Sequence, residues 1–117
     1  MKTILAVDNA IMFLNTLQRL LRDHPYELKC ETSCQEALNY LSHNKPDLIL
    51  LDVEMQDMDG YELCRKIRAG GQRAPILFIT ANNEKEYVDR AIEAGAQGLI
   101  IKPVRIKQLL EKIEELL

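Results

Sequence analysis

The sequence predicts a single α/β domain in which helices cover both faces of a parallel β-sheet. Short apolar segments alternate five times with longer segments whose apolar residues recur at helical spacing. The run 48–51 is uninterrupted and aliphatic, which is typical of a strand buried on both faces. Domains commonly contain about 100–150 residues, so we expect residues 1–117 to fold as one unit.

The N-terminal third contains two predicted strands with a helix between them. Residues 3–7 form an apolar strand that ends at Asp8. The helix 10–22 ends before Pro25, because the residue that precedes a proline is disfavoured in a helix. Its inward stripe is predicted to comprise Ile11, Leu14, Leu17, Gln18 and Leu21. Residues 26–30 alternate between polar and apolar side chains, which indicates an edge strand.

The middle of the chain contains the next helix–strand–helix unit. Ser33 and Glu36 have the spacing of a capping box, which predicts a helix over 33–42. The buried strand 47–51 follows, and the helix 61–69 ends where two consecutive glycines stop it.

The last third repeats the pattern. The apolar strand 75–80 precedes Asn83, which has a glutamate three residues later and therefore predicts a capped helix over 83–95. Strand 98–102 and the amphipathic helix 105–117 complete the chain.

Strict alternation of strands and helices produces a parallel sheet, and right-handed connections leave few strand orders. The polar second strand belongs at an edge of that sheet. The flavodoxin-like order 2-1-3-4-5 satisfies both conditions. We therefore expect a three-layer sandwich of five strands and five helices.

The composition excludes several functional classes. The net charge of −3 argues against a nucleic-acid surface, which is usually basic. No apolar run approaches the roughly 20 residues needed to cross a bilayer, and no signal peptide is recognisable. The three cysteines match no metal motif and are typical of thiols in a reducing compartment, so we expect a cytoplasmic protein.

Polar residues stand at the exits of four predicted strands. They are Asp8 with Asn9, Asp52, Thr80 and Lys102. The carboxyl ends of parallel strands meet at one edge of the sheet, where open α/β sheets bind their ligands. Clustered oxygens suit Mg²⁺, and a carboxylate beside a cation and a hydroxyl is able to accept a phosphoryl group. We therefore take Asp52 as the reactive centre, with Lys102 and Thr80 as contacts of the phosphoryl oxygens.

Each of these residues also has an ordinary structural explanation. Asp8 and Asp52 are common cap or turn residues, Thr80 is a common strand residue, and Lys102-Pro103 is a suitable strand end. Their joint presence at neighbouring strand exits favours a shared site. No histidine base or nucleophile elbow accompanies them, so hydrolysis of the serine type is not supported.

Five motifs occur in order along the whole chain. They are residues 4–8, residues 52–55 with 58–60, residues 79–81, residues 94–96 and the pair Lys102-Pro103. Together they resemble the receiver domain of two-component response regulators, the CheY-like family. The resemblance implies a bacterial signalling switch and not an enzyme with an external substrate.

This resemblance also implies a phosphoryl donor and a metal site. Asp52 would be phosphorylated by a sensor histidine kinase or a phosphotransfer protein with Mg²⁺ present. The metal would be bound by Asp8, Asn9, Asp52 and the backbone carbonyl of Glu54.

The same resemblance implies a route from the site to a partner. Thr80 matches the switch hydroxyl, Lys102 matches the lysine that contacts the phosphate, and the bond before Pro103 would be cis. Residues 83–117 would form the output face for a downstream protein or a homodimer, without nucleic-acid or membrane binding by this domain.

Three positions depart from the family pattern, and the third, Gln56, stands where the loop often has proline. Asn9 replaces the second acid of the acidic pair, so we expect weakened but not abolished Mg²⁺ binding. Leu99 occupies the position of the aromatic switch residue, so the usual inward turn of a ring cannot operate in its ordinary form.

Two alternative functions stay open. Asn9 and Leu99 are compatible with a receiver-like module that binds its partner without phosphorylation. A phosphohydrolase that forms an aspartyl phosphate is disfavoured, because Glu54 stands where such enzymes have a second aspartate and no cap segment is visible.

Overall fold

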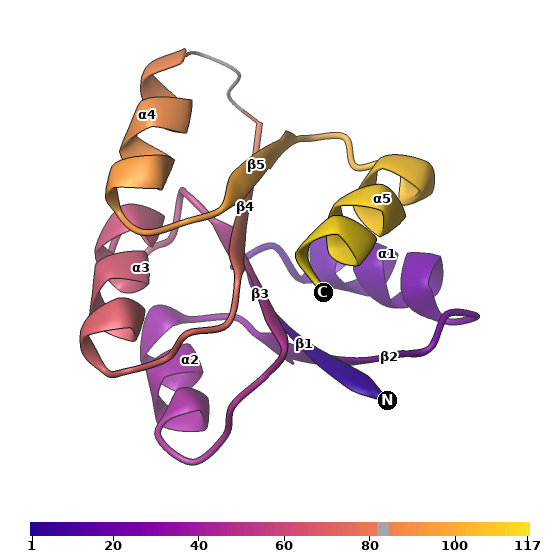
Figure 1. Cartoon of the computed structure of the whole chain (residues 1–117), viewed down its shortest axis with the longest axis horizontal. Helices are drawn as coiled ribbons and strands as arrows, with labels where there is room; N and C mark the ends of the chain where they lie inside the picture. The colour runs from indigo at the N-terminus through magenta and orange to yellow at the C-terminus, as the bar shows by residue number, and fades with distance from the viewer. Residues whose placement is uncertain (82–84) are drawn as a thin grey trace.

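The computed structural model describes residues 1–81 and 85–117, and over these residues five strands alternate with five helices (Figure 1). The elements are β1 (Lys2–Val7), α1 (Ile11–Leu21), β2 (Tyr26–Glu31), α2 (Cys34–Leu41), β3 (Leu48–Asp52), α3 (Gly60–Ala69), β4 (Ile76–Thr80), α4 (Lys85–Glu93), β5 (Gly98–Ile101) and α5 (Ile106–Leu116). All strand pairs are parallel, in the order β2-β1-β3-β4-β5. The predicted fold class and strand order are confirmed, and element ends differ from the prediction by one or two residues.

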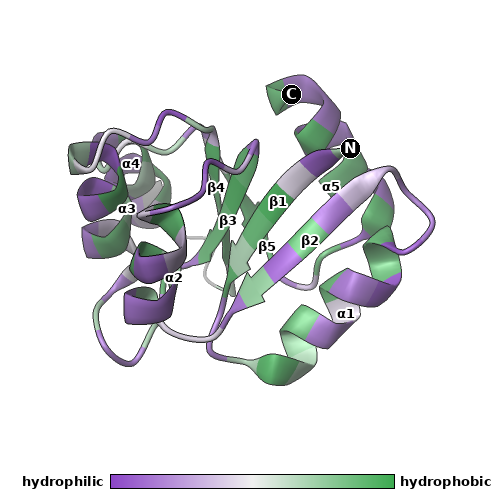
Figure 2. Ribbon diagram, turned by 90° about the horizontal axis from the view of Figure 1, so that it is seen from below, coloured by the Kyte–Doolittle hydropathy of each residue, from purple (hydrophilic) through white to green (hydrophobic). Residues whose placement is uncertain are grey.

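Two layers of helices enclose the sheet. Helices α1 and α5 cover one face, and α2, α3 and α4 cover the other (Figure 1). The strands β3 and β4 are buried along their whole length. Strand β2 lies at the edge and alternates between polar and apolar residues, as predicted (Figure 2). No helix in the described ranges is long and apolar enough to span a bilayer.

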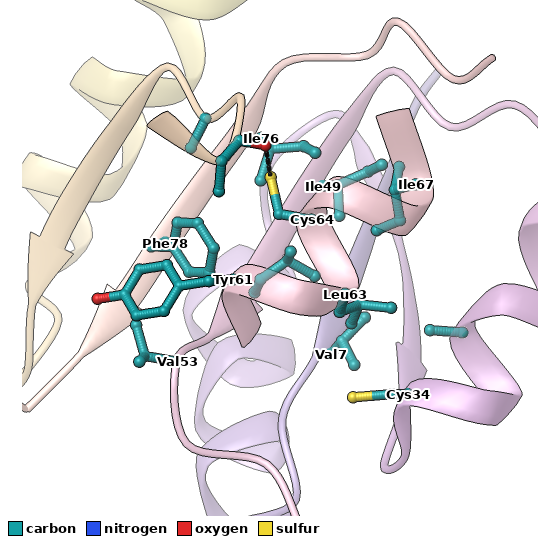
Figure 3. Packing of buried hydrophobic residues seen from close by; sticks show 14 of the residues in the cluster. Val7, Cys34, Ile49, Val53, Tyr61, Leu63, Cys64, Ile67, Ile76 and Phe78 are labelled. Carbon is teal, nitrogen blue, oxygen red and sulfur yellow. Dashed lines mark hydrogen bonds between the residues drawn. The ribbon is translucent and has the colours of Figure 1, made fainter. Parts of the chain in front are cut away.

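The core beneath α2, α3 and α4 is built around two aromatic rings. The Tyr61 and Phe78 rings lie 5.4 Å apart (Figure 3). The Tyr61 hydroxyl donates a hydrogen bond to the backbone carbonyl of Tyr87 in α4. The buried Cys64 thiol donates one to the carbonyl of Ala94 (Figure 3). These contacts join α3 to α4 and to Ala94, the residue that follows α4.

The core beneath α1 and α5 corrects one prediction. Leu14, Leu17 and Leu21 are buried as expected, but Ile11 is 62% exposed. It is the first residue of α1, beyond the end of β1, where the sheet offers no surface to cover it. Gln18, also predicted on this stripe, is exposed as well.

The helix ends follow the predicted capping chemistry where the structure describes them. The Ser33 hydroxyl accepts a hydrogen bond of 3.1 Å from the Glu36 amide. Gly95, at a φ of 106°, follows the end of α4, and such an angle favours glycine. The predicted cap at Asn83 lies outside the described residues.

The guanidinium of Arg68 joins several segments at the rim opposite the predicted site. It donates to the carbonyls of Gly95, Gln72 and Ala74 at distances between 2.8 and 3.1 Å. It also donates to the Gln97 side-chain oxygen, which accepts a further bond from the Ile76 amide. One side chain of α3 therefore ties the start of β4 to the α4–β5 connection.

Candidate functional site

Four strand exits bring the predicted residues to one rim of the sheet. Asp52 and Thr80 end β3 and β4, and Asp8 and Lys102 directly follow β1 and β5. The Lys102 amide donates a hydrogen bond of 2.7 Å to the Thr80 carbonyl, which aligns the last two exits. Asp8, Asp52 and Thr80 are only 2%, 8% and 1% exposed. Acids buried this deeply at the edge of a sheet need a specific environment.

The Lys102 ammonium links the two acids. Its Nζ atom lies 3.0 Å from Asp8 Oδ2 and 4.0 Å from Asp52 Oδ2, although 94 residues separate Lys102 from Asp8. The same atom lies 4.2 Å from the centre of the Phe13 ring in α1. The sequence did not indicate Phe13, because its ring meets Lys102 only in the folded chain.

Asp8 has a structural role in addition to its place in the site. Its Oδ1 atom accepts a hydrogen bond of 2.8 Å from the Ala10 amide, which closes the turn between β1 and α1. Its Oδ2 atom pairs with Lys102. Asp8 is therefore both a turn residue, through Oδ1, and a member of the candidate site, through Oδ2.

Asp52 is an unusually basic carboxylate. Burial, followed by the nearby charge of Asp8, raises the pKa of Asp52 from 3.8 to about 6, against the opposing attraction of Lys102. At neutral pH most molecules still carry Asp52 as the anion. A partly desolvated anion of raised basicity is a suitable nucleophile.

The remaining predicted residues lie around this centre. Asn9 and Glu54 are exposed and directly follow the rim, one after Asp8 and the other two residues after Asp52. Leu99 pairs with Phe78 across the β4–β5 ladder and packs, half-buried, against the core beneath α4. The peptide bond between Lys102 and Pro103 is cis.

The loop after Asp52 is held from two sides. The Gly60 amide donates a hydrogen bond of 2.7 Å to the Val53 carbonyl, which closes the loop onto the end of β3. The Asp57 carboxylate accepts bonds from the backbone amides of Cys34 and Gln35 at the start of α2. The sequence did not indicate this role of Asp57, because a cap supplied from a distant loop leaves no local pattern.

The donor set fits a hard divalent cation. Asp8 and Asp52 carry two negative charges against the single charge of Lys102, so the rim is net negative. Among the described residues no group of three His, Cys, Asp or Glu side chains gathers. An ion here would therefore complete its shell with amide, backbone or water oxygens, as Mg²⁺ commonly does.

Comparisons with known proteins agree with this geometry. The model of the response regulator receiver domain matches residues 4–114. Response regulator MprA of Mycobacterium leprae (strain TN) is 35% identical over 114 residues, which are 97% of this chain and 50% of that protein. MprA of Mycobacterium sp. (strain KMS) is 34% identical with the same coverage. The chain thus spans about half the length of these curated relatives.

Solved structures with the same architecture include two response regulators. A two-component response regulator from Clostridium difficile superposes with a TM-score of 0.94 at 29% identity, covering 99% of this chain and 95% of that one. The chemotaxis response regulator CheY4 of Vibrio cholerae gives a TM-score of 0.92 at 29% identity, covering 100% and 99%. The fold is CheY-like, and the chain belongs to the response regulator receiver domain family.

Proposed function

We propose that this receiver domain is a phosphorylation-dependent switch in which Asp52 accepts a phosphoryl group from a histidine kinase or a histidine-phosphorylated protein. The observation that carries this proposal is the position of the Lys102 ammonium between two buried carboxylates at the rim. Membership of the family supports two-component signalling as the general role.

The transfer step uses groups of the chain in defined roles. A carboxylate oxygen of Asp52 forms a bond to phosphorus while the phosphorus–nitrogen bond of the donor phosphohistidine breaks. The imidazole nitrogen keeps that electron pair, and Asp52 becomes an acyl phosphate. Lys102 would turn from Asp8 toward a phosphoryl oxygen, and the Thr80 hydroxyl would donate to another.

Asp8, Asp52, the Asn9 amide and the Glu54 backbone carbonyl would hold the divalent cation. When bound, Mg²⁺ neutralises the charge that accumulates on the phosphoryl oxygens during transfer. The two acids therefore position the cation, and Asp52 also provides the attacking oxygen.

The switch itself would be a shift between two conformations. Moving a two-state domain from 1:99 to 99:1 requires about 5.5 kcal/mol of differential stabilisation. A group of roughly two negative charges, bound to Thr80 and Lys102 in one conformation only, is able to supply much of this. Residues 83–117 would present the change to a downstream protein or a second copy of the chain. Leu99 would pack in place of a turning ring.

Acetyl phosphate, a small phosphoryl donor, tests the proposal directly. With Mg²⁺, intact-mass analysis should show an adduct of about 80 Da, the mass of a phosphoryl group. The adduct should be absent in Asp52→Ala and present in Asp57→Ala, the matched loss of a carboxylate from the same loop. An adduct that persists in Asp52→Ala would place the chemistry elsewhere.

A phosphorylation-independent interaction module is the second candidate. The amide at Asn9, where the family has an acid, and the aliphatic Leu99 favour it. Under that function no adduct forms at any Mg²⁺ concentration, and Asp52→Asn leaves partner binding unchanged.

A further inference from the structure

The ring of Phe13 contacts the Lys102 ammonium, and the proposed function assigns this contact no role. Its ring centre is 4.2 Å from Lys102 Nζ, which is within the range of a cation–π contact. Phe13 also lines a narrow cavity together with Asp8 and Asp52. The ring is half-buried and the Lys102 side chain is 24% exposed, so water screens this contact only partly.

Lys102 has three neighbours, namely Asp8, Asp52 and Phe13. Binding of the metal ion and of the phosphoryl group would affect them differently. A cation on Asp8 competes with its ion pair to Lys102, and a phosphoryl group on Asp52 changes the second anion. The attraction between the ammonium and the face of Phe13 depends on neither event. The contact with the ring would therefore remain available to the ammonium if Lys102 turns from Asp8 toward a phosphoryl oxygen.

We propose that Phe13 is a positioning residue for phosphoryl transfer, which holds the Lys102 ammonium at the rim while its ionic partners are exchanged. Because this inference rests on the proposed function, it predicts an effect on the rate of phosphoryl uptake that passes through Lys102. A packing role in the core beneath α1 and α5, to which Phe13 also belongs, would not produce that effect.

Substitutions at Phe13 distinguish the effect of the aromatic π face from the effect of apolar packing. Phe13→Leu keeps an apolar side chain but removes the π face, whereas Phe13→Tyr keeps the face. With acetyl phosphate and saturating Mg²⁺, uptake should slow about fivefold in Phe13→Leu, which corresponds to about 1 kcal/mol. It should stay within about twofold of wild type in Phe13→Tyr. Leu21→Val, at the far end of the same helix, controls for weakened α1 packing and should not alter the rate.

A double-mutant cycle with Lys102→Met tests whether the effect passes through the cation. In the Lys102→Met background, Phe13→Leu should cause no further loss of rate. The same cycle on the free energy of unfolding, without Mg²⁺ or donor, measures the contact independently of function and should give a favourable coupling.

The outcomes distinguish the two proposals. If wild type takes up the phosphoryl group and Phe13→Leu does so equally fast, the positioning role is wrong while the switch stands. Equal losses in both Lys102 backgrounds also overturn it. If wild type takes up no phosphoryl group, both the proposed function and the positioning role are wrong. A coupling between Phe13 and Lys102 that is seen only in the free energy of unfolding would then identify Phe13 as a stabilising contact.

Discussion

The Oδ1 atom of Asp57 accepts a hydrogen bond of 3.2 Å from the backbone amide of Cys34, 23 residues earlier in the chain. Its other oxygen accepts a bond of 3.1 Å from the Gln35 amide. The loop that follows Asp52 therefore caps α2 from outside, beside the local cap that Ser33 provides. A negative charge at this place also interacts favourably with the positive end of the helix dipole.

Asp57→Ala should lower the free energy of unfolding by about 1 kcal/mol, the usual cost of losing a helix cap. Urea denaturation of the metal-free protein measures this loss. Asp23→Ala removes an exposed carboxylate from the α1–β2 loop and should change stability by less than about 0.5 kcal/mol. Equal losses in the two variants would mean that Asp57 acts only through the net charge.

The contribution of Asp57 should also depend on pH. Desolvation alone would raise the pKa of Asp57, but the hydrogen bonds from Cys34 and Gln35 together outweigh it and lower the pKa below 3.8. The folded state thus binds this proton less readily than the unfolded state. Its stabilisation is complete above the unfolded pKa and is lost as the pH falls through the lowered one. The difference in stability between wild type and Asp57→Asn should shrink in that acid range.

Asp52 should have the opposite dependence on pH. The pKa of Asp52 is about 6 in the folded protein and 3.8 for an ordinary aspartate, so ionisation of Asp52 opposes folding. The metal-free protein should therefore lose stability as the pH rises from 3.8 to about 6. At pH 7, Asp52→Asn should be more stable than wild type by up to about 3 kcal/mol. Thermal unfolding at several pH values tests this, with Asp57→Asn as the matched amide variant. Mg²⁺ should narrow the difference, because it stabilises the ionised wild type more.

Gly60 should tolerate no side chain. A Cβ atom there would overlap the Asp52 carbonyl and lie 2.9 Å from the Val53 Cα, both of which belong to the backbone. Gly60→Ala should therefore cost about 2 kcal/mol or more in unfolding free energy and slow phosphoryl uptake. At Gly70 an added Cβ meets ordinary contacts of 3.4 and 3.6 Å, so Gly70→Ala is the control and should remain close to wild type. Similar stability of the two variants would contradict the close approach at Gly60.

Asn9→Asp should bind Mg²⁺ more tightly than wild type. The added carboxylate restores a second charged ligand beside Asp8, and a hard cation prefers a charged oxygen to an amide oxygen. Titration of Mg²⁺ against backbone amide chemical shifts gives both affinities. Equal affinity of the two proteins would refute a direct role of position 9 in the metal site.

The sequence predicted those features that depend on local pattern. Strand β3 was recognisable because four aliphatic residues precede Asp52, and the alternation in β2 correctly indicated an edge. The gathering of Asp8, Asp52 and Lys102 followed from their strand exits, since parallel topology places those exits at one rim.

What could not be predicted depends on contacts between distant segments. Ile11 is apolar and correctly spaced, yet it is exposed because it lies beyond the end of the sheet. The support of Lys102 by Phe13 requires the relative placement of α1 and the β5 exit. The capping of α2 by Asp57 depends on the conformation of the loop after β3, which local sequence propensity does not determine.

The hydrogen bonds of Arg68 bear on how a change at the rim could reach α4. The guanidinium fastens the segment after the C-terminal end of α4, through Gly95 and Gln97, to the start of β4. Near its other end α4 is held through Tyr87, whose backbone carbonyl accepts the 3.4 Å hydrogen bond from the Tyr61 hydroxyl. A shift at Thr80 would therefore reach α4 through the turn that contains Tyr87, while the hydrogen bonds of Arg68 keep the segment at Gly95 in place.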